Sequence, residues 1–325
     1  MSAGPEEIAL AVVRLRAGGV VAFPTETVYG LGADALNPTA IDRVFALKGR
    51  PAHNPLIVHV RDDTMARTVV DQWPDAAARL AAVFWPGPLT IVLPRAPQLP
   101  AAITAGGPTV GIRCPGHHVT LALLTALGRP LVGPSANPSG GVSPTTAEHV
   151  RASFTPEEVY VLDGGPCRGG IESTVLSLAG SQPRILRPGL ISAEEIEIVL
   201  GQAVADPKQS PPSPGARLES PGQLAVHYAP RSPAVLFDPH EWPSLAAAAR
   251  GPIMVLGRTM TAIENPHALI RMPAEAGPYA ARLYAALREA DAALPSLIAI
   301  ERPPATGPIW DAIADRLARA TARPA

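Results

Sequence analysis

Proline is the residue that most constrains how this chain can fold. The sequence holds 39 prolines among 325 residues, more than twice the usual share of about 5%. Because proline lacks a backbone donor and breaks a helix interior, these residues are expected in turns, loops and linkers. The chain should therefore alternate short regular elements with loops.

Length and composition describe an ordered chain without a strong bias of charge. A chain of 325 residues is longer than the usual single domain of about 100–200 residues and predicts two domains. Hydrophobic residues make up 47% and charged residues 17%, which excludes a disordered chain. The 27 basic and 28 acidic residues give a net charge of -1. A general nucleic-acid binder is normally basic, so only a local basic patch stays open.

Cysteine content and terminal sequence limit the compartment and the metal chemistry. Cys114 and Cys167 are too few for a disulfide framework or a four-thiolate metal site, and no CxxC is present. The N-terminus lacks a basic stretch followed by an apolar core and a cleavage site. No run approaches about 18 apolar residues without a charge or proline, so no transmembrane helix is expected. We expect a cytoplasmic protein without a membrane partner.

Residues 1–200 alternate short apolar runs with patterns of helical period. Strands are predicted at 20–23, 56–60, 90–93, 110–113, 131–133, 159–162, 173–177 and 184–186. Helices are predicted at 6–17, 38–48, 76–84, 119–127, 146–151 and 193–200. Several strands follow one another without an intervening helix. This order predicts an α/β fold with a mixed, α+β-like sheet rather than a purely parallel one.

The sequence changes character at residue 206. The proline-rich, polar residues 206–233 are expected to form an extended linker. Beyond it, strands at 234–237, 253–256 and 296–300 alternate with helices at 244–249, 278–290 and 308–320. Helices between strands imply crossover connections and a smaller three-layer α/β domain. The predicted division is a first domain at 1–205, the linker at 206–233 and a C-terminal domain at 234–325.

Three short motifs match known functional patterns only in part. GLGADA (30–35) resembles a dinucleotide fingerprint, but residues 24–29 separate it from the preceding strand. A tight backbone bend explains its glycines better. GPSAN (133–137) lacks the last glycine of a nucleophile elbow, and His117 and His118 have no further metal ligands at a useful spacing. A dinucleotide site, a serine hydrolase and a metal centre are therefore disfavoured.

The most informative segment runs from residue 23 to residue 59. A predicted strand leads into PTET (24–27), which places hydroxyl groups at a strand tip. Lys48 and Arg50 follow each other at the end of a predicted helix. Two such cations could clamp a polyphosphate, although they also complement the helix dipole. His59 ends the next strand, where a structural role is the alternative.

Further segments supply arginines, hydroxyls and backbone donors. Thr109, Gly111 and Arg113 share one face of a strand, where a substrate carboxylate would match the guanidinium. The loop at 133–145 is dense in hydroxyls, although turn chemistry explains that composition too. DGGPCRGGIESTV (163–175) adds donors, and Arg187 follows. Without a Cys–His pair or paired carboxylates, this repertoire suits aligning phosphates and neutralising their charge.

Taken together, these segments resemble the YrdC-like family of threonylcarbamoyl-AMP synthases. Ten motifs occur in the family order: PTETVYGLG (24–32), KGR (48–50), NPLIVH (54–59), PGPLT (86–90), VGIRCP (110–115), PSANPSG (134–140), SPT (143–145), DGG (163–165), GIESTV (170–175) and RPG (187–189). HYAP (227–230), LYAALREAD (283–291) and AIADRL (312–317) look like the two-domain branch. GPIWDA (307–312) departs from the Gly-Leu-Gly-like turn expected there.

The resemblance implies a twisted mixed sheet around a positively charged cavity. It implies a nucleotidyltransferase that forms L-threonylcarbamoyl-AMP and pyrophosphate from L-threonine, bicarbonate and ATP. The product serves the N6-threonylcarbamoyladenosine (t6A) modification of tRNA. A separate threonylcarbamoyl-transferase machinery makes the final transfer, so weak or no direct tRNA binding is expected. Mg²⁺ is expected on the ATP phosphates, because the sequence shows no carboxylate cage for it.

By the same resemblance, the family's site residues carry over to matching positions. The implied catalytic residues are Lys48 and Arg50. The residues implied to bind ATP are Arg50, Asn54, Thr109, Ser135, Ser143, Arg187 and Tyr228. The residues implied to hold threonine are Thr27, His59, Arg113, the Gly133 backbone and Ser173. No residue is assigned to a metal.

Alternatives concern both the activity and the linker. A carbamoyl-adenylate-forming maturation protein of the same core would carry an acylphosphatase-like region and zinc-finger cysteines, and neither is present. An RNA-binding module without catalysis is disfavoured by the net charge and by an aromatic content of 4%. In the linker, Tyr228 either anchors the segment against a domain or closes over the cavity as a lid that excludes water.

Overall fold

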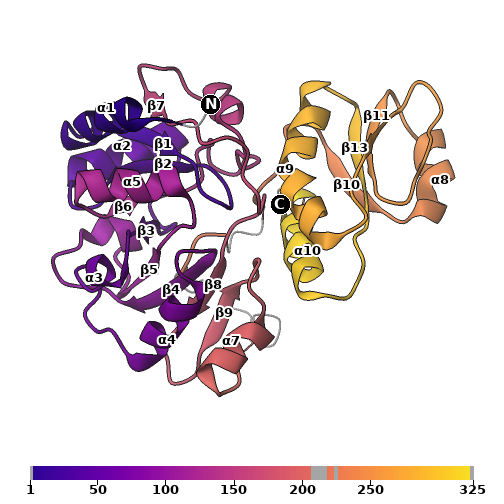
Figure 1. The fold of residues 1–325 in the computed structure, drawn as a ribbon. Coiled ribbons are helices and arrows are strands. Elements are labelled where there is room, and N and C mark those ends of the chain that lie inside the picture. The colour runs from indigo at the N-terminus through magenta and orange to yellow at the C-terminus, as the bar shows by residue number, and fades with distance from the viewer. Residues whose placement is uncertain (1–2, 206–217, 223–225, 323–325) are drawn as a thin grey trace.

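The computed structural model describes residues 3–205, 218–222 and 226–322. They form two bodies, each built around its own sheet (Figure 1). The larger sheet has nine strands in the order β7-β1-β2-β6-β3-β5-β4-β8-β9, and the smaller has four in the order β10-β13-β11-β12. An α/β fold with a second, smaller sheet is what the sequence predicts.

The larger sheet is mixed, as predicted. Its strands are β1 (Val20–Phe23), β2 (Gly30–Asp34), β3 (Ile57–His59), β4 (Leu89–Pro94), β5 (Thr109–Arg113), β6 (Leu131–Val132), β7 (Val159–Val161), β8 (Thr174–Ser177) and β9 (Arg184–Arg187). Its helices are α1 (Pro5–Arg16), α2 (Pro38–Lys48), α3 (Asp63–Ala66), α4 (Asp75–Phe84), α5 (His118–Leu127), α6 (Ala147–Arg151) and α7 (Ala193–Leu200), with a 3-10 turn at Ala101–Thr104. The pairs β1/β7, β3/β5 and β4/β8 are parallel and the other pairs antiparallel.

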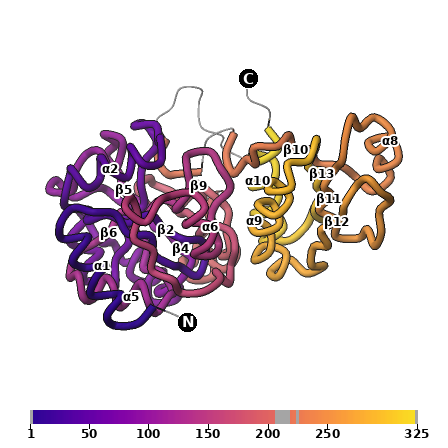
Figure 2. Tube along the Cα trace, turned by 90° about the horizontal axis from the view of Figure 1, so that it is seen from above, coloured from indigo at the N-terminus to yellow at the C-terminus, as the bar shows by residue number. Residues whose placement is uncertain are grey.

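The smaller sheet is entirely parallel. Its strands are β10 (Ala234–Phe237), β11 (Ile253–Gly257), β12 (Ala268–Arg271) and β13 (Leu297–Glu301). Its helices are α8 (Trp242–Ala247), α9 (Ala276–Ala292) and α10 (Pro308–Ala320), with a 3-10 turn at Pro239–Glu241. Figure 1 shows α8 on one side of this sheet and α9 with α10 on the other, which makes three layers. Figure 2 shows that α9 and α10 lie toward the larger body.

Local signals around α2 explain how two basic side chains reach one place. The Asn37 side chain accepts a hydrogen bond from the Ala40 amide at the start of the helix. Gly49 ends the helix in the left-handed conformation, with φ of 57°. Lys48 is therefore the last helical residue, and Arg50 begins the loop that leads to β3.

The glycines of GLGADA (30–35) do not form the tight bend that we expected from the sequence. They lie in β2, which pairs with β1 in an antiparallel register. A Cβ atom on Gly30 would lie 2.6 Å from the Phe23 ring, and one on Gly32 would lie 2.8 Å from it. These glycines serve the close approach of an aromatic ring to a strand.

The two bodies share a hydrophobic cluster. Val28, Val142 and Ile171 of the larger body belong to the cluster that also holds the buried faces of α9 and α10. Gly170 lies directly against α9: its φ is +72°, and a Cβ there would lie 2.2 Å from the carbonyl oxygen of Ala280. The second body therefore packs on the first through this hydrophobic cluster and through a close backbone contact at Gly170.

Candidate active site

A narrow cavity lies between the larger body and the segment that leads to the second body. The larger body contributes Thr25, Thr27, Arg50, His59, Arg113, Gly133, Ser135, Glu172, Ser173 and Arg187 to its wall, and the connecting segment contributes Pro221, His227 and Tyr228. Its volume is about 50 Å³. The cavity is therefore small, and three residues of the connecting segment close part of it.

Lys48 points its ammonium group at backbone oxygens of the hydroxyl-rich loop. Its Nζ donates to the carbonyls of Ser135 at 2.6 Å and Asn137 at 2.5 Å. The side chain is buried. Burial, together with the charge of Arg50, lowers the pKa of Lys48 well below its ordinary value. The ammonium thus fixes the loop at 133–145 against the end of α2.

Arg50 is held by the loop that follows it. Its Nε donates to the Asn54 carbonyl at 3.0 Å, and its Nη2 donates to the Asn54 side-chain oxygen and the Pro55 carbonyl, each at 2.7 Å. Burial lowers the pKa of Arg50 to about 10. Since a pKa of about 10 lies well above neutral pH, the guanidinium stays charged. Its partners are neutral oxygens, so they do not cancel this charge at the cavity wall.

Arg187 enters the cavity from the end of β9. Its Nε and Nη2 donate to the Ser173 carbonyl at 3.1 and 3.0 Å, and Nη2 also reaches the Ser173 hydroxyl at 3.2 Å. That hydroxyl lies 2.8 Å from the hydroxyl of Thr90. Burial lowers the pKa of Arg187. Here too a buried guanidinium is oriented by uncharged groups.

Arg113, by contrast, has a carboxylate partner. Its Nη2 lies 2.8 Å from Oε1 of Glu26, as an ion pair rather than an aligned hydrogen bond. Its Nε donates to the Gly87 carbonyl at 3.2 Å. Glu26 is itself fixed by the Gly116 amide, at 2.9 Å. Two nitrogens of this guanidinium, Nη2 and Nε, are thus held by groups of the larger body.

His59 lies beside Arg113 in the paired strands β3 and β5. Its ring packs edge-on against Phe23, with centroids 5.3 Å apart. Burial, and then the charge of Arg113, lower the pKa of His59 to about 3. A Cβ on Gly133 would lie 2.7 Å from His59 Nδ1. The neutral imidazole therefore packs directly against the backbone of Gly133 at the cavity wall.

Thr27 and Ser135 complete the polar wall. The Thr27 hydroxyl lies 2.8 Å from that of Thr25, whose oxygen also accepts from the Val28 amide. Ser135 forms an isolated bridge with Gly30 at the edge of β2. Both residues line the cavity, so PTET and the loop at 133–145 meet there, as the shared motif order implied.

Ser143 meets the cavity through a carboxylate. Its hydroxyl donates to Oε1 of Glu172 at 2.7 Å, and Glu172 lines the cavity. Although burial opposes ionisation, the charges of Arg316 and Arg187 and the hydrogen bond from Ser143 lower the pKa of Glu172 to about 2. Glu172 is therefore a carboxylate beside the ATP-binding residues expected from the sequence.

Tyr228 closes the cavity from the connecting segment. Its ring is 1% exposed, stacks on Tyr284 of α9 at 5.7 Å and lies 5.5 Å from the Arg316 guanidinium of α10. The neighbouring His227 ring packs edge-on at 4.0 Å. Tyr228 has a φ of 60°, a region that non-glycine residues rarely adopt. Tight packing on both sides holds this conformation.

Thr109 is the one expected site residue that lies elsewhere among the described residues. It begins β5 and lines a different hollow of about 380 Å³ with Ser177, Arg184 and Glu219. Lys48, Asn54 and Ser143 do not form the cavity surface themselves, but each bonds to a group that does. The other expected residues all line the cavity between the larger body and the connecting segment.

Three residues of this region were missed in the sequence. Glu26 and Glu172 each lie inside a recognised motif, next to a residue with an implied role. Arg316 lies in AIADRL, 144 residues from its partner Glu172. A buried carboxylate needs a cation, but the sequence does not say which arginine supplies it.

Neither a metal centre nor a membrane helix is found in the described part of the chain. In that part, no group of three or more His, Cys, Asp or Glu side chains is arranged to hold a metal ion. None of its helices is long and apolar enough to cross a bilayer. The chemistry available is that of buried cations, hydroxyls and backbone groups.

The fold and the site define a class: a two-body α/β protein whose larger body lines a cavity with buried basic side chains. Arg50, Arg113 and Arg187 line the cavity and Lys48 lies behind its wall, and each of the four is 8% exposed or less. A family model described as telomere recombination, Sua5_yciO_yrdC, matches residues 13–189. A second, described as the C-terminal domain of threonylcarbamoyl-AMP synthase, matches residues 191–322. The chain belongs to the Sua5–YciO–YrdC family.

Individual relatives agree with this assignment. Threonylcarbamoyl-AMP synthase of Pyrococcus abyssi is 44% identical over 232 residues, which cover 71% of this chain and 68% of the relative. The Bacillus subtilis enzyme of that name is 44% identical over 244 residues, covering 73% and 68%. The crystal structure of P. abyssi Sua5 complexed with L-threonine superposes with a TM-score of 0.90 at 37% identity, covering 97% of this chain and 94% of the other.

Proposed function

We propose that this chain is an L-threonylcarbamoyladenylate synthase, which makes threonylcarbamoyl-AMP and pyrophosphate from L-threonine, bicarbonate and ATP. The observation that carries the proposal is a group of buried basic side chains at one cavity. Arg50, Arg113 and Arg187 line it, and Lys48 lies directly behind its wall. This arrangement suits a reaction between anions. Relatives that carry the enzyme's name match most of the chain at 44% identity.

The reaction brings two anions together. The amine of threonine and bicarbonate give a carbamate with loss of water. A carbamate oxygen then attacks the α-phosphorus of ATP, the bond between the α- and β-phosphates breaks, and pyrophosphate leaves with its electron pair. Since carbamate and triphosphate repel each other, the protein has to hold them in line and offset their charge.

The ATP side of the proposal rests on Lys48, Arg50 and Arg187. The two guanidiniums line the cavity and are held by carbonyl and hydroxyl oxygens, so a triphosphate is the negative charge that they lack. Lys48 keeps the loop at 133–145 in place and adds positive charge behind it. Asn54 orients Arg50, and Ser135, Ser143 and Tyr228 would border the nucleotide. Thr109 keeps its expected role only as a proposal, given its different hollow.

The threonine side of the proposal rests on Arg113 and His59. The Arg113 guanidinium would bind the substrate carboxylate. His59, neutral because of its low pKa, would accept a hydrogen bond from the substrate rather than repel it. Thr27, Ser173 and the Gly133 backbone would meet the amine and the hydroxyl. P. abyssi Sua5 has been crystallised as a complex with L-threonine, which supports a threonine site in this fold.

Within the described residues, the side chains near the cavity do not offer magnesium a set of carboxylate ligands. The carboxylates nearest the cavity, Glu26 and Glu172, are occupied by Arg113, Ser143, Tyr284 and Arg316. We propose that Mg²⁺ arrives on the ATP phosphates, while the side chains of the cavity bind and align the reacting groups.

The connecting segment acts as a lid in this proposal. Pro221, His227 and Tyr228 form one wall of the cavity, whose volume is about 50 Å³. Moving this wall would admit the substrates, and closing it would protect the carbamoyl-adenylate from water. The proposed division at 1–205, 206–233 and 234–325 keeps this segment separate, although part of 206–233 lies outside the described residues.

Tyr228→Ala tests the lid. The variant should make threonylcarbamoyl-AMP more slowly than wild type and release more of its ATP as AMP without product. It should also melt at a lower temperature, because the ring is packed between the two bodies. Equal product yield per ATP in both proteins would leave the segment as an anchor only.

An omission experiment tests the function. Pyrophosphate release should require ATP, Mg²⁺, L-threonine and bicarbonate together, and mass spectrometry should find the threonylcarbamoyl-AMP product. Equal release without threonine would sink the assignment. Filter binding with tRNA should show weak or no retention. The expected partners are then the small substrates and the downstream transferase machinery, in the cytoplasm.

A further inference from the structure

A carboxylate of the larger body is held mainly by the smaller one. Oε2 of Glu172 accepts from the Tyr284 hydroxyl of α9 and from Arg316 Nε of α10, both at 2.9 Å. Arg316 Nη2 reaches the Glu172 carbonyl at 3.4 Å. Arg316 is fully buried and Glu172 is 7% exposed. The two bodies are thus joined by an ion pair that water does not screen.

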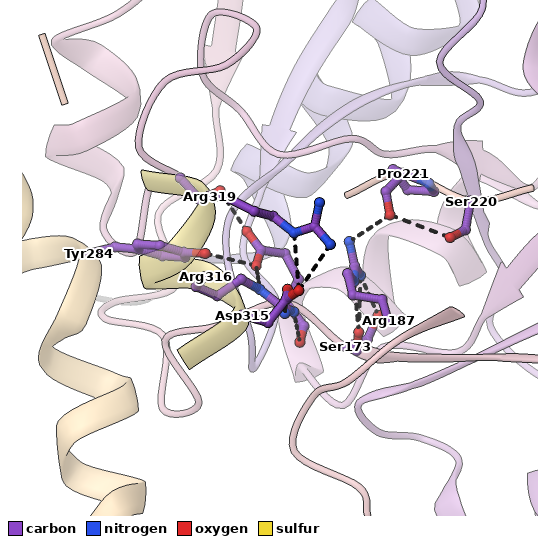
Figure 3. Close-up of polar contacts among 10 residues, drawn as sticks. Ser173, Arg187, Ser220, Pro221, Tyr284, Asp315, Arg316 and Arg319 are labelled. Atoms are coloured by element: carbon purple, nitrogen blue, oxygen red, sulfur yellow. Dashed lines mark hydrogen bonds and ion pairs between the residues drawn. The ribbon is translucent and has the colours of Figure 1, made fainter. Parts of the chain in front are cut away.

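The same carboxylate lies beside the cations of the cavity. Ser173, the residue after Glu172, is the anchor of Arg187. Figure 3 shows Arg316 and Tyr284 on one side of this region and Arg187 with Ser173 on the other. The charges of both Arg316 and Arg187 lower the pKa of Glu172. Glu172 therefore faces two guanidiniums, of which one belongs to the proposed ATP site.

Removal of Arg316 would change the balance between these groups. A buried carboxylate without its partner is costly, and Arg187 is the cavity cation whose charge already acts on Glu172. If Glu172 moved toward Arg187 and paired with it, the Arg187 guanidinium would no longer be available to the triphosphate. Its own repulsion of the phosphates would add to the effect.

We propose that Arg316 is a positioning residue for ATP binding, which holds Glu172 so that Arg187 stays available to the nucleotide. The inference rests on the proposed function of the cavity. It gives the second body a role in binding, because α10 supplies the charge that keeps a carboxylate of the site out of the way of ATP.

The position of Arg316 also connects this role to the lid. Its guanidinium lies over the Tyr228 ring, and its Nη1 donates to Asp315 at 2.9 Å. One side chain therefore contacts the connecting segment and the carboxylate of the site. Docking of the second body and binding of ATP favour each other in this arrangement, and such coupling is reciprocal.

Removing the two charges singly and together tests the inference. Calorimetry with Mg-ATP, without threonine, would compare wild type with Arg316→Met, Glu172→Gln and the double variant. Arg316→Met should weaken ATP binding by about tenfold or more, the usual loss for one charge-assisted contact. Glu172→Gln should bind ATP more tightly than Arg316→Met, because it removes the carboxylate charge that competes for Arg187. The double variant should recover most of the affinity that Arg316→Met loses.

Arg282→Met is the matched control, since Arg282 pairs with Glu289 within α9. A purely structural role for Arg316 predicts that Glu172→Gln and the double variant bind as poorly as Arg316→Met, and that pattern would overturn the inference. So would unchanged affinity in Arg316→Met. If Arg316→Met does not fold, the double variant and Arg316→Lys decide the question. Pyrophosphate release by wild type tests the proposed function separately.

Discussion

The two bodies differ in how several of their buried charges are partnered. In the larger body, Lys48, Arg50 and Arg187 are surrounded by carbonyl and hydroxyl oxygens, which orient a cation without cancelling it. In the smaller body, buried charge is used up internally: Glu301 accepts from the Arg258 and Thr259 amides and from the Thr259 hydroxyl.

This difference separates charges that are available to a substrate from charges that stabilise the fold. Because their partners are neutral, the buried cations of the larger body keep a positive charge that an anionic substrate can balance. Burial also lowers the pKa of each of these cations. The second body's carboxylates close turns and fasten the chain, as when Asp291 accepts from the Arg231 and Ser232 amides. Glu172 and Arg316 are where the two uses meet.

The largest effect is expected from Arg50→Met. Removing one preorganised charge from a reaction between anions typically costs about 10²–10³-fold in rate. Arg43→Met is the control, because Arg43 lies in the preceding helix and donates to the Gly18 carbonyl instead. Pyrophosphate release per enzyme would be measured for both. A loss of less than about threefold in Arg50→Met, far below that range, would show that neutral partners do not mark the catalytic charges.

Arg113→Lys should give the next largest effect. An ammonium keeps the charge near Glu26 but loses the planar fork, so threonine affinity should fall by roughly 10–150-fold while ATP affinity is nearly unchanged. Calorimetry with each substrate separates the two. Arg129→Lys serves as control, since Arg129 pairs with Asp34 at an exposed position. Equal weakening for ATP and threonine would contradict distinct subsites.

Acid should destabilise the larger body through His59. Its folded pKa of about 3 lies below the unfolded value of about 6.5, so between these values the unfolded chain takes up a proton that the folded chain excludes. The free energy of unfolding should therefore fall as the pH drops from about 6.5 toward 3. His59→Gln should flatten this dependence in urea titrations. A variant with the wild-type slope would refute the assignment.

The smallest effect is expected from Tyr228→Phe. The Tyr228 hydroxyl has no hydrogen-bond partner among the described residues, whereas its ring packs on both sides. Removing the oxygen should change the synthesis rate by less than about tenfold, the loss expected for a charge-assisted contact. Steady-state rates at saturating substrates would decide. A larger loss would mean that the hydroxyl touches the nucleotide.

Elements with strong local signals were predicted well. The helix at 38–48 and the strand at 20–23 have the predicted bounds, because capping residues and a continuous apolar run define them. β2 was missed since its glycines, interpreted as a bend, make room for Phe23. β12 was missed because it is an edge strand of only four residues, too short for its apolar run to stand out.

The site was predictable as a set of motifs but not as a network. The motifs identified Arg50, Arg113 and Arg187 as site residues, and the structure places all three in one cavity. It did not reveal that Glu26 holds Arg113, or that Glu172 is satisfied from the second body, because such partners depend on contacts between distant segments. The different placement of Thr109 has the same cause: a shared strand face does not decide which hollow an end residue lines.

Gly170 places a steric limit on how the two bodies pack together. All the charges described above act over several ångströms, but the carbonyl of Ala280 leaves no space for even one carbon atom at this glycine. A methyl group there would be a wedge that forces the bodies apart and leaves every ionisable group intact. The bodies can pack this closely only because residue 170 has no side chain. A steric change at this one position could therefore separate them without altering any charge.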